Sequence, residues 1–113
     1  KNDESISVSS INKTKKGTLM TGLPINTDYS NQGLKALIDD FQNWKKIRMI
    51  GSAAMAAAYV ASGMADFYKE KRTNIWDIAA GVAIVRAAGG EADIINLKQD
   101  HSLDIQISNG KFI

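Results

Sequence analysis

The sequence has 113 residues, which is enough for one small domain and too few for two. Its 14 basic and 12 acidic residues give a formal net charge of +2, so the composition supports neither a nucleic-acid partner nor a membrane surface. No cysteine is present, which excludes a disulfide framework and a thiolate metal site and leads us to expect a cytoplasmic protein.

The first two predicted strands precede the only proline. Residues 2–11 alternate loosely, with Ile6 and Val8 on one face, and predict a short or edge strand. Residues 17–23 are more apolar and predict a second strand, which ends at a loop marked by Pro24.

The first helix is predicted over residues 30–44, with Ser30 as its cap. Residues 46–50 then predict a short strand. The helix is indicated by apolar residues that recur at three- and four-residue spacing: Leu34, Leu37, Ile38 and Phe41.

An uncharged, alanine-rich stretch covers residues 49–65. It is shorter than the roughly 20 apolar residues that a transmembrane helix needs. We therefore predict that residues 52–62 form a buried helix of a soluble domain, which Gly63 ends because glycine readily adopts the left-handed conformation. Residues 65–71 predict the next strand.

The last third of the chain predicts a helix over residues 76–88 and strands over 91–95 and 103–108. A polar loop with Asp100 and His101 separates the two strands. The alternation of strands and helices predicts an α/β fold, in which the last two helices pack on the sheet. The pair of strands at the start of the chain suggests that this sheet is mixed.

Asp77 is the first candidate for chemistry. It lies in the first turn of the helix predicted over residues 76–88, where free backbone N–H groups and the helix dipole stabilise an ionised carboxylate. Such a carboxylate is a suitable ligand for a hard cation. From this feature alone, an acidic helix-start residue with no further role is the simpler interpretation.

Two linked segments resemble the inositol monophosphatase family. One has a Trp-Asp pair, small residues, an apolar helix face and a closing Gly-Gly, and the other has a glycine-led helix followed by a strand. The residues concerned are Gly51-Ser52-Ala53-Ala54, Tyr59-Val60-Ala61, Gly63, Ala65-Asp66, Trp76-Asp77-Ile78-Ala79-Ala80-Gly81, Ile84 and Ala88-Gly89-Gly90, with Thr21-Gly22-Leu23-Pro24 and Asn109-Gly110 elsewhere. The resemblance covers roughly residues 4–113. It implies that residues 1–113 are the C-terminal half of the family's αβαβα sandwich, with the N-terminal half absent.

The resemblance implies hydrolysis of a phosphate monoester of an inositol or a sugar by Mg²⁺-activated water. It gives the role of metal ligand to Asp77 and contacts with substrate hydroxyl groups to Glu70. The helix start at Gly51, Ser52 and Ala53 is expected beside the substrate, since exposed N–H groups at a helix start receive oxygen ligands. No catalytic acid, base or nucleophile is assigned within this chain.

The sequence also departs from the family pattern. The family's first half supplies a Glu and an Asp-Pro-Ile/Leu-Asp-Gly-Thr motif, and this motif is absent from the sequence. Since one carboxylate cannot hold a catalytic metal cluster, we expect the chain alone to be inactive. Residues 71–75 replace a Gly and a Pro that family members often have, which places extra positive charge near the substrate.

Two alternatives remain open: a 3′(2′),5′-bisphosphate nucleotidase or fructose-bisphosphatase-like enzyme of the same superfamily, and a non-catalytic domain that binds a partner. Because the face that the N-terminal half would cover must be apolar, we expect a homodimer, aggregation or association with that half. Among the remaining candidates, His101 is interpreted as a solvated surface residue, and Trp76, Tyr59 and Phe67 as core residues.

Overall fold

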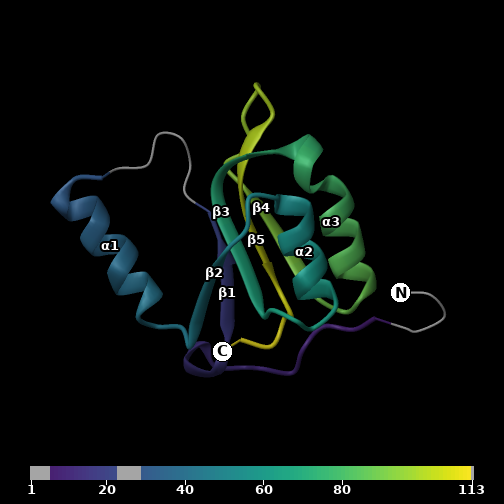
Figure 1. The fold of residues 1–113 in the computed structure, drawn as a ribbon. Helices are drawn as coiled ribbons and strands as arrows, with labels where there is room; N and C mark the ends of the chain where they lie inside the picture. Colours follow the sequence, from purple (N-terminus) through teal and green to yellow (C-terminus); the bar gives the residue numbers. More distant parts are fainter. Residues whose placement is uncertain (1–5, 23–28, 113) are drawn as a thin grey trace.

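The computed structural model describes residues 6–22 and 29–112, and shows one five-stranded sheet with helices beside it (Figure 1). The predicted α/β layering is therefore confirmed. In chain order the elements are the 3-10 turn η1 (Thr14–Lys16), β1 (Thr18–Thr21), α1 (Asn31–Phe41), β2 (Lys46–Met49), α2 (Ala53–Ala61), β3 (Phe67–Asn74), α3 (Ile75–Ala87), β4 (Glu91–Ile95) and β5 (Ser102–Ser108).

The strand order in the sheet is β2-β1-β3-β5-β4. β1 runs parallel to both β2 and β3, whereas β5 runs antiparallel to both β3 and β4. The sheet is mixed, as predicted, but the cause differs from the prediction. The antiparallel part comes from the C-terminal β4–β5 hairpin and not from a pair of strands at the start of the chain.

Side-chain caps begin all three helices. The Ser30 hydroxyl accepts a hydrogen bond from the Gly33 N–H, and the Ser52 hydroxyl accepts one from the Met55 N–H. The Asn74 side chain accepts a hydrogen bond from the Trp76 N–H. Each cap satisfies one of the N–H groups that the first turn leaves without a helical partner, and together they fix where the helices start.

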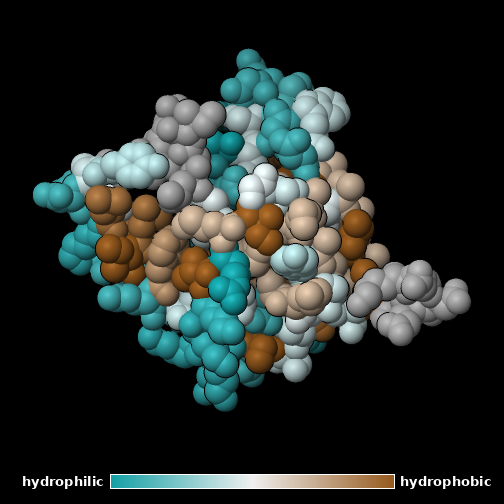
Figure 2. All heavy atoms as spheres, in the orientation of Figure 1, coloured by the Kyte–Doolittle hydropathy of each residue, from teal (hydrophilic) through white to brown (hydrophobic). Residues whose placement is uncertain are grey.

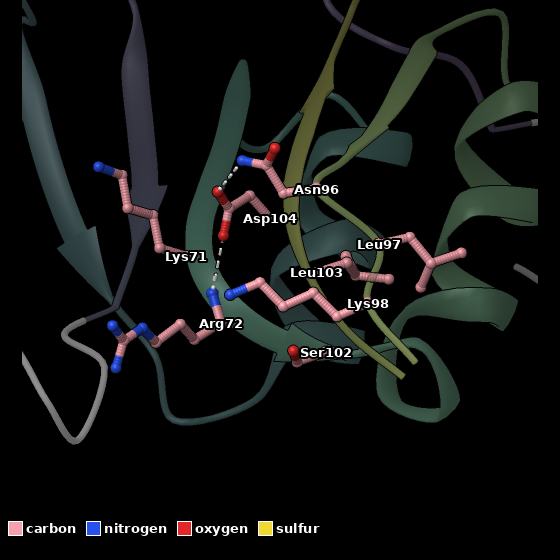
Figure 3. Close-up of a pocket in the computed structure, with 8 residues that line it drawn as sticks. All are labelled: Lys71, Arg72, Asn96, Leu97, Lys98, Ser102, Leu103 and Asp104. Atoms are coloured by element: carbon pink, nitrogen blue, oxygen red, sulfur yellow. Dashed lines mark hydrogen bonds between the residues drawn. The ribbon is translucent and has the colours of Figure 1, made fainter. Parts of the chain in front are cut away.

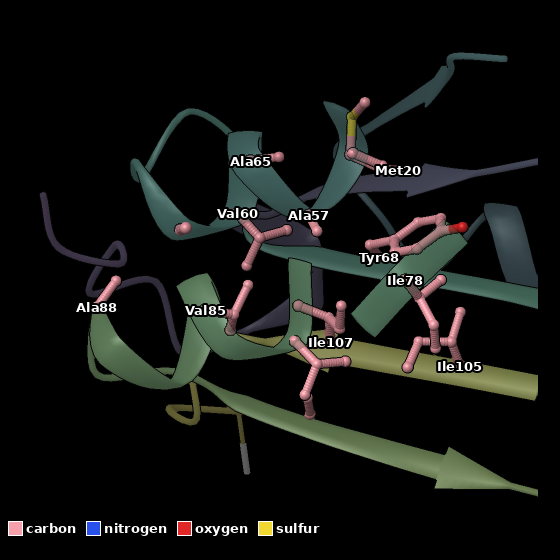
Figure 4. Packing of buried hydrophobic residues seen from close by; sticks show 14 of the residues in the cluster. Met20, Ala57, Val60, Ala65, Tyr68, Ile78, Val85, Ala88, Ile105 and Ile107 are labelled. Atoms are coloured by element: carbon pink, nitrogen blue, oxygen red, sulfur yellow. The ribbon is translucent and has the colours of Figure 1, made fainter. Parts of the chain in front are cut away.

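Helices α2 and α3 cover one face of the sheet and enclose the core (Figures 1 and 4). The fully buried side chains come from both helices and from the strands below them, as Val60, Tyr68, Ile78 and Ile107 illustrate. A Cβ atom on Gly81 of α3 would lie 2.5 Å from the Cβ of Ala57 in α2. The two helix backbones therefore approach as closely as they do because residue 81 has no side chain.

Helix α1 lies apart from this core, at one side of the sheet (Figure 1). None of its described residues is buried. It is linked to the sheet by an ion pair between Asp40 and Lys69 of β3, at 2.5 Å. The apolar stripe that predicted α1 is therefore incompletely covered by the described part of the chain.

The strand predicted over residues 2–11 is wrong for the residues that the structure describes, since residues 6–11 are in no strand; residues 2–5 lie outside the described part. Ile6 and Val8 do pack against the core. Val8, however, donates its N–H to the Ala88 carbonyl at the end of α3, at 3.2 Å. A helix end offers one carbonyl and no extended partner, so no strand ladder forms.

Polar contacts also fasten this N-terminal segment. The Ser9 hydroxyl donates to the Asp66 carboxylate, which also accepts from the Thr18 N–H at 2.8 Å. The fully buried Asn109 donates to the Ile11 carbonyl at 2.7 Å. Side chains thus replace the missing ladder, which satisfies buried polar groups of the segment.

Phe67 of β3 packs in an aromatic cluster with Trp44 and Phe112, at ring-centroid distances of 5.4 and 5.7 Å. Tyr59 is partly buried against the core. The alanine-rich stretch forms the nine-residue helix α2. Within the described residues, no helix combines the length and hydrophobicity that crossing a membrane requires.

The close approach of α2 and α3 predicts that Gly81→Ala destabilises the fold. The new methyl group would overlap Ala57, and overpacking costs about 1–3 kcal/mol, more than the gain of up to ~1 kcal/mol from replacing a helical glycine. We expect the free energy of unfolding in urea to fall by about 1–2 kcal/mol. Adding Ala57→Gly should restore part of this loss, whereas strictly additive effects of the two substitutions would contradict the proposed overlap.

Candidate functional site

The predicted site residues lie where the parallel strands end. β1, β2 and β3 are parallel, so their carboxyl ends meet at one edge of the sheet. The chain passes from β1 out to β2 and then returns across β1 to β3, which makes the end of β1 a switch point between two crossovers. Helices α2 and α3 begin at this same end (Figure 1). Ligands of open α/β sheets bind at such points.

Residues 51–53 form the entry to α2. Gly51 is exposed, and a Cβ atom built on it would meet nothing within 4 Å. Ser52 is the N-cap, and its hydroxyl is engaged with the Met55 N–H at 3.2 Å. We therefore expect a ligand at this helix start to bind the backbone N–H groups from Ala53 onward, because the serine hydroxyl is already used for the cap.

Glu70 of β3 is partly buried. It lies beside Tyr68 and Gly22, for which the sequence predicted no role at the site. The Tyr68 hydroxyl donates a hydrogen bond to its carboxylate at 3.2 Å. The Gly22 backbone lies so close that any Cβ atom there would overlap the carboxylate. Burial raises the pKa of Glu70 above its usual value, while the hydrogen bond from Tyr68 acts in the opposite direction.

Asp77 is the third residue of α3 and is exposed. Its negative charge, like that of Glu70, acts on the buried phenol of Tyr68. Burial raises the pKa of Tyr68 far above its usual value, and the negative charges of Glu70 and then of Asp77 raise it further. Since both charges act on one phenol, the structure brings the two predicted carboxylates into the same electrostatic environment.

The donor set suits a hard cation but is incomplete. Among residues 6–22 and 29–112, no three Asp, Glu, His or Cys side chains are grouped so that they could hold a metal ion. Asp77 offers an exposed carboxylate with oxygen ligands of the kind that Mg²⁺ prefers. Because Mg²⁺ requires six ligands, this chain would contribute to such a site and not complete it.

The prediction that Trp76 is a core residue is wrong. Its side chain is 74% exposed and contacts His101, with ring centroids 5.5 Å apart. The α3 start leaves this face of the helix without a cover in the described chain. His101 is exposed, as predicted.

Tyr68 and Gly22 lie beside Glu70, although the sequence predicted no role at the site for either of them. A signal for Tyr68 was present in the spacing, because residues two apart on a strand share a face. Gly22 gave no such signal, since its proximity to Glu70 depends on the alignment of β1 with β3, in which Met20 lies opposite Tyr68.

A family model described as the inositol monophosphatase family matches residues 1–108. The fructose-1,6-bisphosphatase/inositol-1-monophosphatase of Thermotoga maritima is 56% identical over 46 residues, which are 41% of this chain and 18% of the relative. The inositol-1-monophosphatase of Caulobacter vibrioides is 35% identical over 86 residues, 75% of this chain and 33% of the relative.

The structure of the inositol monophosphatase from Anabaena superimposes with a TM-score of 0.83 at 29% identity. The match covers 98% of this chain and 46% of that chain. The chain thus spans about half the length of this structural relative, and a third or less of the two curated relatives. Since the family model matches nearly the whole sequence and the fold agrees, the chain belongs to the inositol monophosphatase family.

Proposed function

We propose that this chain supplies one side of the active site of a Mg²⁺-dependent phosphatase that acts on an inositol or sugar monophosphate. The observation that carries the proposal is that Tyr68 donates a hydrogen bond to Glu70 at the strand ends where α2 also begins, with Asp77 in the first turn of α3, close enough for its charge to act on the same phenol. Phosphatase names of the relatives, including the inositol-1-monophosphatase of Caulobacter vibrioides, support this activity.

The two carboxylates suit different roles. Asp77 is exposed in the first turn of α3 and offers its carboxylate oxygens to solvent, so we assign it the role of holding Mg²⁺. When bound, Mg²⁺ lowers the pKa of the attacking water and neutralises charge on the phosphoryl oxygens. Glu70 is held by Tyr68 and accepts hydrogen bonds from substrate hydroxyl groups.

The backbone at Gly51, Ser52 and Ala53 completes the described part of the site. Because the Ser52 side chain is used for capping, we assign the substrate contact to the N–H groups at the α2 start. The missing side of the active site would come from the family's other half. This chain alone is therefore expected to release no phosphate.

The surface of α1 supports association with a further polypeptide. Leu34 and Ile38 on α1 are 39% and 55% exposed, and Tyr29 just before the helix is 62% exposed. Apolar side chains gather over α1 in Figure 2. An amphipathic helix normally buries such a face, so we propose that the other half of the fold, or a second copy of the chain, covers it.

The role of Asp77 predicts that Asp77→Asn abolishes Mg²⁺-dependent activity and leaves the fold intact. The amide keeps the shape of the side chain but removes the charge that binds the cation. We expect phosphate release by the full-length protein to fall on the order of a hundredfold or more across a Mg²⁺ titration. Asp93→Asn, at an exposed β4 position, is the matched control and should retain its rate. Equal rates and equal Mg²⁺ dependence for wild type and Asp77→Asn would show that Asp77 only begins a helix.

The contact between Tyr68 and Glu70 predicts a change in acidity. In Tyr68→Phe the carboxylate loses its hydrogen-bond donor, so the pKa of Glu70 should rise further while the ring remains buried. The measurement is an NMR titration of the Glu70 carboxyl carbon against pH. Tyr59→Phe removes a hydroxyl elsewhere and should leave that titration unchanged; an unshifted Glu70 in Tyr68→Phe would remove Tyr68 from the site.

The uncovered α1 face predicts self-association of the 113-residue chain on its own. Sedimentation should show dimers or larger species, because exposed apolar area is buried on contact. The double variant Leu34→Gln/Ile38→Gln should sediment as a smaller species. Ile94→Gln/Leu97→Gln replaces two apolar residues exposed to 41% and 55% elsewhere and serves as the control. A well-folded wild-type monomer would contradict the prediction.

A further inference from the structure

A cavity of about 480 Å³ lies between the bulged part of β3 and the turn that joins β4 to β5 (Figure 3). Its lining includes three cationic side chains, those of Lys71, Arg72 and Lys98, and one carboxylate, that of Asp104. Three positive charges and one negative charge give this lining a formal charge of +2. The volume is in the range of pockets that hold small metabolites.

The cationic side chains are placed by a β-bulge. The pairing of β3 with β5 shifts between Glu70 and Thr73, so that Lys71 and Arg72 both lie opposite Asp104. Arg72 has a φ of 58°, in the left-handed region that few non-glycine residues adopt. A bulge redirects side chains and is common beside functional sites. Here it places two successive cations on the β3 wall of the cavity, with their side chains extending from the strand away from the turn (Figure 3).

Asp104 does not neutralise these cations by direct pairing. One of its carboxylate oxygens accepts from the Arg72 N–H at 3.0 Å, and the other accepts from the Asn96 side chain at 3.0 Å. The hydrogen bond from Asn96, followed by that from Arg72 and by the charges of Lys71 and Lys98, lowers the pKa of Asp104. The carboxylate therefore serves as an ionised structural link between the bulge and the turn.

The cations themselves form no direct ion pair with an acidic side chain in the described part of the chain. The ion pairs found there join Lys35 to Asp39 and Lys69 to Asp40, and neither involves a residue of the cavity. Lys98 extends from the turn toward the β3 bulge, as Figure 3 shows. Three like charges around one opening repel each other, and an anion between them would relieve that repulsion.

We propose that this cavity binds the phosphate group of a small phosphorylated molecule. A phosphate dianion matches the formal charge of +2 and offers three oxygens to the cations, of which Lys71 and Arg72 belong to one wall and Lys98 to the other. The planar guanidinium of Arg72 can make two parallel hydrogen bonds to phosphate, and the two lysines act as point charges. The remaining volume admits the molecule that carries the phosphate.

The cavity is joined to the proposed active site through its walls. Lys71 follows Glu70 directly on β3. The turn is fixed to the start of α3, because Ile75 donates its N–H to the His101 carbonyl at 3.0 Å and Trp76 packs on the His101 ring. Asp77 is the next residue of that helix. A phosphate in the cavity would therefore lie beside the elements that carry both proposed site carboxylates.

The test is calorimetric titration of the full-length protein with inorganic phosphate, at low ionic strength and in EDTA. EDTA removes any metal-held phosphate, so the result does not depend on the proposed hydrolysis. We expect saturable binding to the wild type and a loss of affinity of tenfold or more in Lys71→Gln/Arg72→Gln/Lys98→Gln. Absence of binding to the wild type, or equal affinity in the variant, would overturn the proposal.

Two further variants separate a site from general charge and from misfolding. Lys13→Gln/Lys16→Gln/Lys111→Gln removes the same charge from exposed positions elsewhere and should bind within about threefold of wild type. An equal loss in this control would overturn the proposal. Lys71→Arg/Lys98→Arg keeps the charge and should retain binding, whereas loss of binding in this folded variant would also count against it.

Titration with a sugar monophosphate and a sugar bisphosphate then identifies the source of the phosphate. If the cavity takes the second phosphate of a substrate, the bisphosphate should bind the wild type at least tenfold more tightly than the monophosphate, and the cavity variant should lose that advantage. If one phosphate is sufficient, both sugars should lose affinity equally in the variant. Unchanged affinities for both sugars would contradict binding at the cavity.

Discussion

The close approach of α2 and α3 is the constraint on which the arrangement of the site depends. Gly81 and Ala57 meet where a single additional methyl group would not fit. Both helices begin at the same end of the sheet, so their separation sets the distance between the Gly51 entry to α2 and Asp77 in the first turn of α3. Close-packed interiors deform little, and a contact in the helix middle therefore fixes groups one to two turns away.

The same end of the sheet gives two carboxylates different environments. Glu70 extends from a strand beside the buried Tyr68, where burial raises its pKa and one hydrogen bond holds it in place. Asp77 extends from a helix start into solvent. A positioned, partly desolvated carboxylate suits recognition of hydroxyl groups, and an exposed one suits a hydrated cation. The division of roles that we propose for them rests on where the chain places each group.

Local signals in the sequence were sufficient for most of the fold. Apolar periodicity and caps predicted α1, α2 and α3 to within a few residues, since those signals act over one or two turns. The predicted N-terminal strand failed because alternation of Ile6 and Val8 reports a buried face but not a backbone partner. Trp76 is exposed and not a core residue because no described segment covers it, and its own local sequence carries no information about such cover.

The candidate site was predictable to the extent that it consists of helix starts and a family motif. Part of what escaped prediction depends on contacts between strands. Tyr68 reaches Glu70 along one strand, but Gly22 reaches it only because β1 and β3 are in register. No sequence pattern indicated where β3 would bulge.

The bulge at Arg72 sets the backbone shape of the end of β3, next to Glu70. Of the described non-glycine residues, those with positive φ are Arg72, Asn96 and His101, at 58°, 57° and 69°. All three lie in the bulge or in the β4–β5 turn. Residues held in such conformations cost of order 1–3 kcal/mol each, so the surrounding contacts must hold them there. Asp104 does so for two of them, through the Arg72 N–H and the Asn96 amide. The carboxylate therefore stabilises a backbone shape that sets two cations beside Glu70, and a regular strand pair would have alternated them onto opposite faces.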